Sequence, residues 1–93
     1  MAGKTRILIV EDEGVIALEL RDRLADMGYD LVGPVPSGQE AIDHARELVP
    51  DLVLMDIILI GQMDGIEASE IIRNSLDIPV IFVMISINNV CFR

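Results

Sequence analysis

Cysteines, basic residues and long hydrophobic runs are scarce in this sequence, and each shortage excludes a class of protein. Cys91 is the only cysteine, so neither an internal disulfide nor a multi-cysteine metal site can form. Seven basic residues are scattered along the 93 residues and the net charge is −9, which argues against binding to nucleic acid or to an anionic membrane. The longest apolar run, Val80 to Ile85, is far below the roughly 20 residues of a membrane span.

The remaining composition indicates one well-cored domain. Hydrophobic residues make up 52% of the chain, and the mean hydropathy is +0.49. No positively charged segment followed by a long apolar stretch opens the sequence, so a secretory signal is not expected. We therefore expect a single domain over residues 1–93 in the cytoplasm.

Apolar patterning predicts strands that alternate with helices. Strands are expected at residues 5–10, 30–35, 51–55 and 78–85, and helices at about 13–27, 37–49 and 64–76. This alternation predicts an α/β fold with a doubly wound parallel sheet. Gly33 and Pro34 interrupt the second strand, which places it toward a sheet edge.

Each predicted helix has an apolar stripe that should face the sheet. The stripes consist of Ile16, Leu20, Leu24 and Met27, of Ile42, Ala45 and Leu48, and of Ile66, Ile71 and Ile72. Two pairs have capping-box spacing at a helix start, Ser37 with Glu40 and Asp64 with Glu67.

Acidic residues directly follow two of the predicted strands. Glu11, Asp12 and Glu13 follow the first strand, Asp56 follows the third, and Asp64 lies a short distance further on. The carboxyl ends of parallel strands meet at one edge of an open sheet, where α/β proteins bind their ligands. The spacing therefore predicts one metal and phosphoryl site.

Clustered carboxylates repel one another by about 1 to 4 kcal/mol per pair, and a bound divalent cation is the simplest compensation. Mg²⁺ suits such a site because it prefers oxygen ligands. Asp56 could itself act as the nucleophile, since a carboxylate can accept a phosphoryl group to give an acyl phosphate. The alternative is that each acid is a solvated strand end or a helix N-terminal charge, which we expect for Glu13.

Five segments between residue 5 and about residue 83 carry a more specific pattern: ILIVEDE, GPVPSGQEAIDHA, PDLVLMDI, MDGIEA and IPVIFV. In this order and spacing they resemble the receiver domain of two-component response regulators. The resemblance implies a flavodoxin-like fold. It also implies that a histidine kinase or phosphotransfer protein donates a phosphoryl group to the chain, and that the chain is a phosphoacceptor signalling domain rather than an enzyme.

The resemblance also implies roles for individual residues. Asp56 would be the phosphoacceptor. Asp12 and Asp56 would bind Mg²⁺ through their carboxylates, Glu11 would do so directly or through water, and the backbone carbonyl of Ile58 would be a further ligand. The loop from Asp56 to Asp64 is one residue longer than the family's commonest form, so the assignment of Ile58 depends on the path of this loop.

Three positions depart from the family pattern. Met84 stands where receivers usually have a hydroxyl residue that contacts the phosphoryl group, and a thioether donates no hydrogen bond. Ile85 stands where a small residue normally leaves access. The family's lysine after a fifth strand has no counterpart, because the only lysine, Lys4, precedes the first strand. We therefore expect impaired phosphotransfer and switching.

The sequence stops before the family's fifth strand, and residues 84–93 resemble nothing in the family. We expect a truncated receiver of about four strands and three helices, with an atypical tail over residues 84–93. Strand 78–85 would then be an uncharged sheet edge, which is a template for pairing with another strand. Self-association through this fourth strand is expected.

Two other functional classes stay open. A degenerate receiver would keep the fold and act as a binding or oligomerisation module without phosphotransfer. An aspartyl-phosphate hydrolase is a third class, although Ile57 and Ile58 follow Asp56 and no second aspartate stands two residues on as general acid.

Overall fold

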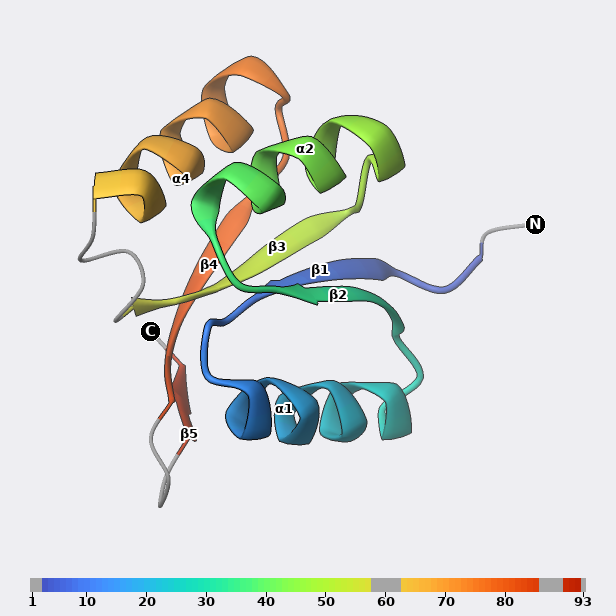
Figure 1. Cartoon of the computed structure of the whole chain (residues 1–93). Helices are drawn as coiled ribbons and strands as arrows, with labels where there is room; N and C mark the ends of the chain where they lie inside the picture. The colour runs from blue at the N-terminus through green and yellow to red at the C-terminus, as the bar shows by residue number, and fades with distance from the viewer. Residues whose placement is uncertain (1–2, 58–62, 86–89, 93) are drawn as a thin grey trace.

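A single sheet with helices on both faces forms the protein (Figure 1). The computed structural model describes residues 3–57, 63–85 and 90–92. The elements in chain order are β1 (Arg6–Val10), α1 (Gly14–Asp26), β2 (Asp30–Val35), α2 (Gly38–Leu48), β3 (Leu52–Asp56), α4 (Met63–Ser75), β4 (Val80–Ile85) and β5 (Val90–Phe92). The strand order is β2-β1-β3-β4-β5, with β1 to β4 parallel. The predicted flavodoxin-like arrangement is confirmed, and β2 lies at a sheet edge as expected.

The hydrophobic core has two layers because strand residues alternate between the two faces of the sheet. Ile7 and Ile9 of β1 pack toward α1, whereas Leu8 and Val10 pack toward α2 and α4. Figure 1 shows the same division, with α1 on one face of the sheet and α2 and α4 on the other. No helix within the described residues combines the length and the apolar character needed to cross a membrane.

Helix ends and stripes follow the sequence pattern only in part. Ser37 caps α2 as predicted, because its hydroxyl accepts a hydrogen bond from the Glu40 amide at 3.3 Å. The prediction that Asp64 caps α4 is wrong, since the helix already begins at Met63. Met27 and Ile66 were predicted to face the sheet, but both side chains are exposed.

The fifth strand departs from the expected open edge. β5 pairs antiparallel with the second half of β4, with Val83 opposite Phe92 and Ile85 opposite Val90. The prediction that strand four forms the exposed sheet edge is therefore wrong over Val83–Ile85. Three residues are too short a run to show a strand period, so sequence patterning had no signal for β5.

Gly33 lies where β2 passes closely beside β1. Its φ of +89° is in the region that favours glycine. A Cβ atom at this position would lie 2.9 Å from the Ile9 carbonyl oxygen and 3.0 Å from the Val35 amide nitrogen. Both neighbours are backbone atoms, so neither can move aside without shifting a strand.

Replacing Gly33 by alanine should therefore destabilise the fold. We expect Gly33→Ala to lower the free energy of unfolding by roughly 1 to 3 kcal/mol, the cost of one strained backbone position. Gly14→Ala is the matched control, because nothing lies within 4 Å of a Cβ there. Urea denaturation of the three chains measures the difference, and equal midpoints for both variants would contradict the expectation.

Candidate phosphoacceptor and metal site

Parallel pairing of β1 with β3 places the acidic residues. Val10 lies opposite Met55 in the register, so the residues that follow in register, Glu11 and Asp56, lie side by side at the carboxyl end of the sheet. The Glu11 amide donates a hydrogen bond of 2.9 Å to the Val35 carbonyl of β2. Glu11 is thereby held by the neighbouring strand on the other side as well.

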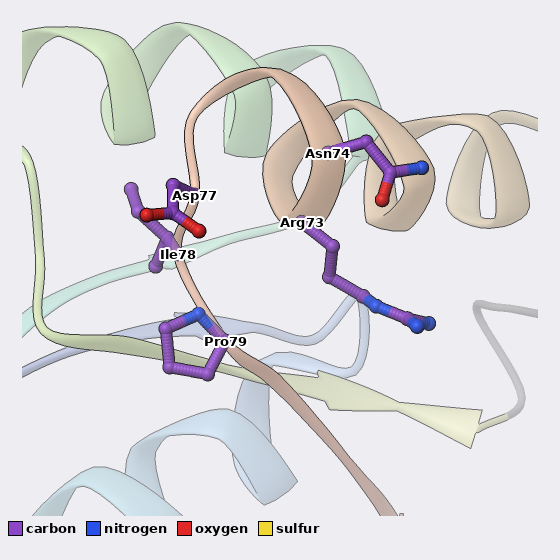
Figure 2. A pocket seen from close by; sticks show the side chains of 5 residues that line it. All are labelled: Arg73, Asn74, Asp77, Ile78 and Pro79. Atoms are coloured by element: carbon purple, nitrogen blue, oxygen red, sulfur yellow. The ribbon is translucent and has the colours of Figure 1, made fainter.

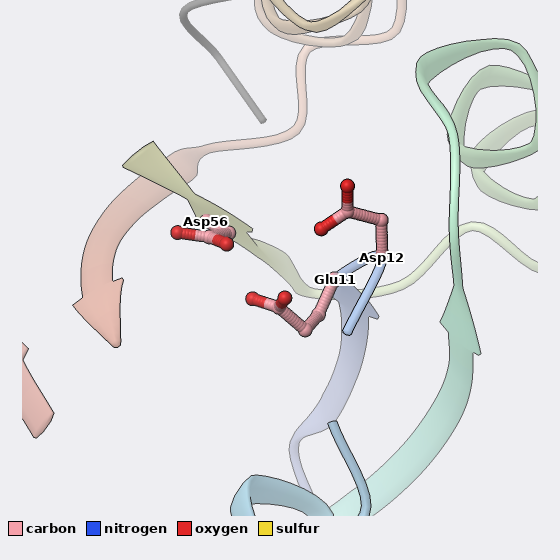
Figure 3. A group of neighbouring side chains, drawn as sticks. All are labelled: Glu11, Asp12 and Asp56. Atoms are coloured by element: carbon pink, nitrogen blue, oxygen red, sulfur yellow. The ribbon is translucent and has the colours of Figure 1, made fainter. Parts of the chain in front are cut away.

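Three carboxylates gather at this point. One oxygen atom from each of Glu11, Asp12 and Asp56 lies within 4.8 Å of the others (Figure 3). Glu11 and Asp56 are each only 3% exposed, whereas Asp12 is exposed to solvent. The structure thus brings together the three acidic side chains that the family resemblance names as metal ligands, two of them buried.

Glu11 has an unusual environment for a carboxyl group. Its Oε1 accepts a hydrogen bond from the Glu13 amide at 2.9 Å, while Oε2 is buried with no hydrogen-bond partner among the described residues. Burial above all, and then the adjacent Asp56 carboxyl, raise the pKa of Glu11 to about 8, against the opposing effect of the Glu13 amide. A proton or a cation therefore stabilises this group.

The arrangement fits a hard divalent cation. All side-chain donors are carboxylate oxygens, which Mg²⁺ prefers, and the buried Oε2 of Glu11 is a ligand atom available for coordination. Asp12 lies at the solvent side, where a cation that keeps several waters has room for them. Such an ion would also reduce the mutual repulsion of the three carboxylates.

The other predicted residues are distributed differently. Ile58 lies outside the described residues, as do the side chains of Asp64 and Met84. Glu13 is the N-cap residue of α1 and makes no side-chain capping hydrogen bond. Lys4 precedes β1, at the end of the sheet opposite to Asp56.

A hollow of about 350 Å³ lies away from the acidic cluster. It is lined by Arg73, Asn74, Asp77, Ile78 and Pro79, around the connection from α4 to β4 (Figure 2). Because this connection enters the amino end of β4, the hollow and the carboxylates lie at opposite ends of the sheet.

Exposed apolar side chains lie on the segments that directly follow the acidic residues, and sequence patterning did not single them out. Val15 and Leu18 of α1 are 75% and 55% exposed, and Ile57, which directly follows Asp56, is also exposed. The sequence does mark Val15 and Leu18 in one way, because both are apolar yet lie outside the apolar stripe of α1. Apolar groups beside a buried carboxylate are suited to contact with a protein rather than with water.

Comparisons with known proteins identify the family of this chain. Residues 7–90 match the family model of the response regulator receiver domain. The transcriptional regulatory protein PdtaR of Mycobacterium tuberculosis is 40% identical over 76 residues, which cover 82% of this chain and 37% of PdtaR. The chemotaxis protein CheY of Thermotoga maritima is 40% identical over 63 residues, which cover 68% of this chain and 52% of CheY.

A solved structure is similar in both fold and sequence. The signal receiver domain of a modulated diguanylate cyclase from Desulfovibrio desulfuricans superposes with a TM-score of 0.77 at 39% identity, over 88% of this chain and 66% of that one. The chain belongs to the response regulator receiver domain family of two-component systems. It spans between about a third and a half of the length of the two curated relatives described above.

The raised pKa of Glu11 predicts a pH-dependent stability. The folded chain holds the Glu11 proton up to about pH 8, whereas the unfolded chain releases it near 4.5. The unfolded state therefore binds fewer protons between these values, and the free energy of unfolding falls as pH rises through this window. We expect the melting temperature, measured with a chelator present, to fall from pH 5 to pH 8.

Glu11→Gln should remove most of this slope and raise the melting temperature at pH 8, because a neutral amide replaces the buried carboxylate. Glu13→Gln is the matched control on an exposed neighbour and should leave the slope unchanged. A parent chain and a Glu11→Gln variant with parallel pH profiles would contradict the assigned burial effect.

Proposed function

We propose that this receiver domain accepts a phosphoryl group on Asp56 from a histidine kinase or a phosphotransfer protein, with Mg²⁺ bound beside it. The observation that supports this most strongly is the pairing of two buried carboxylates, Asp56 and Glu11, at the carboxyl end of adjacent strands. A fold gains nothing in stability from burying two such groups together, so a bound charge is the simplest reason for the arrangement.

The proposed chemistry is a displacement at phosphorus. A carboxylate oxygen of Asp56 attacks the phosphorus atom of a phosphohistidine, and the new O–P bond forms an acyl phosphate. The P–N bond to the imidazole breaks, and the leaving imidazole nitrogen takes up a proton. Asp56 serves as the nucleophile because it is the last residue of β3 and so lies at the carboxyl end of the sheet.

Glu11, Asp12 and Asp56 are the proposed side-chain ligands of Mg²⁺, with the backbone carbonyl of Ile58 as a further ligand. When bound, the ion would offset the charge of the incoming phosphoryl group. Glu11 contributes a buried ligand whose position is fixed from both sides, by the Val35 carbonyl and the Glu13 amide. Asp12 contributes an exposed carboxylate that can adjust to an entering ion.

We infer that signalling after phosphorylation is impaired. Met84 occupies the position of the usual hydroxyl residue and cannot donate a hydrogen bond to the phosphoryl group. Lys4 lies at the wrong end of the sheet to pair with that group. The proposed chain is thus a phosphoacceptor with weakened readout.

The proposed partner surface is the apolar group of Val15, Leu18 and Ile57. These side chains are exposed and lie on the first half of α1 and directly after β3, at the end of the sheet where a donor protein would approach Asp56. The net charge of −9 favours a donor surface with basic residues around an apolar centre. Nucleic acid and membrane surfaces do not suit a chain of this charge.

We further propose that residues 1–93 form one cytoplasmic receiver unit with an atypical segment over residues 84–93, and that it self-associates through β4. Ile81 supports the last point, because its apolar side chain is 40% exposed beside the sheet edge.

A degenerate receiver that binds partners without phosphotransfer is the second candidate function. It is favoured by Met84, which replaces the usual switch hydroxyl. The two candidates share the same fold and surface, and they differ in whether Asp56 is ever phosphorylated.

The decisive measurement is the intact mass after incubation with Mg²⁺ and a small acyl phosphate as donor. We expect a single phosphoryl adduct on the parent chain and none on Asp56→Asn, because an amide is a poor nucleophile toward phosphorus. Chelation of Mg²⁺ should suppress the adduct. A folded parent chain without any adduct would favour the degenerate receiver.

The partner surface has its own test. Leu18→Gln should slow phosphoryl transfer from a phosphohistidine protein by about tenfold, corresponding to about 1.4 kcal/mol of lost contact. The rate from the small donor should not change. Ala25→Gln is the matched control, since it lies seven residues further along the same helical face and is exposed. Equal slowing by both variants would contradict the proposed surface.

A further inference from the structure

The outer edge of β4 is only half covered. β4 runs over Val80–Ile85, and β5 pairs with its last three residues only. Within the described residues, no strand pairs with Val80–Phe82 on that side of the sheet. Ile81, in the middle of this open half, is 40% exposed.

The cover provided by β5 is weak. An antiparallel pairing of three residues has few hydrogen bonds, and a strand of six residues could form about twice as many along the same edge. β4 has the sequence VIFVMI, without charge or proline, which is the composition that pairs most readily with another strand. A longer strand of the same kind would therefore compete with β5.

We propose that β5 blocks part of the outer edge of β4 in the monomer, and that a second copy of this chain displaces β5. In the dimer the two β4 strands pair antiparallel along all six residues. The two-fold axis passes between Phe82 and Val83, so the open half of each strand meets the half that β5 covers in the monomer. This inference rests on the proposed self-association and adds its regulation, namely that release of β5 is required for the full interface.

A second copy is the proposed partner because it offers the same uncharged six-residue strand, and the salt dependence of binding distinguishes it from a basic protein. Each copy has a net charge of −9, but β4 itself is uncharged. Repulsion between copies therefore acts over distance and is screened by salt, with a Debye length of about 10 Å at 0.1 M. Dimerisation should strengthen as salt is added, whereas binding of a basic protein would weaken.

The test compares the dimer dissociation constant of the full chain with that of Val90→Pro by sedimentation equilibrium. Proline in β5 removes a strand N–H and restricts the backbone, so β5 pairs less well with β4. We expect the dissociation constant to fall by about tenfold. Phe92→Pro is a second variant of the same strand, and circular dichroism shows that each variant is folded.

Two lysine variants locate the interface in the Val90→Pro background. Ile81→Lys places a charge on the proposed edge and should restore the monomer. Ile66→Lys is its matched control, because Ile66 is also 40% exposed but lies on α4, and it should leave the dimer intact.

Hydrogen exchange on the unmodified chain tests the displacement directly. With rising protein concentration, amides of Val90–Phe92 should lose protection, while those of Val83–Ile85 should keep it. Two outcomes would contradict the displacement of β5 but not self-association. These are equal dissociation constants for the parent and the β5 variants, or protection of β5 amides that does not change in the dimer. Chains that stay monomeric in every variant would overturn both.

Discussion

The parallel pairing of β1 with β3 is the constraint on which the site depends. Its register sets Val10 against Met55, and the chain then has no freedom to separate the carboxylates of Glu11 and Asp56. The preceding residues of both strands are buried, alternately in the core layer that faces α2 and α4 and in the layer that faces α1. Moving either carboxylate would require shifting a central strand, so the hydrophobic core holds the acidic site in place.

This placement sets stability against function. Two buried carboxylates weaken the fold unless a proton or a cation is present, and the pKa of about 8 at Glu11 reflects that conflict. A proton supplies the compensation below this pH, and the proposed divalent cation would supply it when Glu11 is ionised. The same unfavourable burial that costs stability would therefore favour binding of a cation.

Much of the fold and of the acidic cluster could be predicted because continuous apolar strands followed by acids leave few alternatives. That the carboxyl ends of β1 and β3 lie side by side follows from parallel strands joined by right-handed crossovers. Met27 and Ile66 were misplaced, because helix periodicity alone does not say where the sheet beneath a helix ends. β5 was missed, since a three-residue pairing depends on its partner strand rather than on its own sequence.

The edge of the sheet and the acidic site meet at one residue of β4. Val83 lies opposite Asp56 in the register with β3 and opposite Phe92 in the register with β5. It is 1% exposed, so it is packed too tightly to move independently of its neighbours. A change in the strand beyond β4 would therefore act on a residue that is paired with Asp56, although the proposed chemistry at Asp56 needs only the carboxyl end of β3. The proposed phosphoryl acceptance and the proposed strand exchange would thus act on opposite sides of β4.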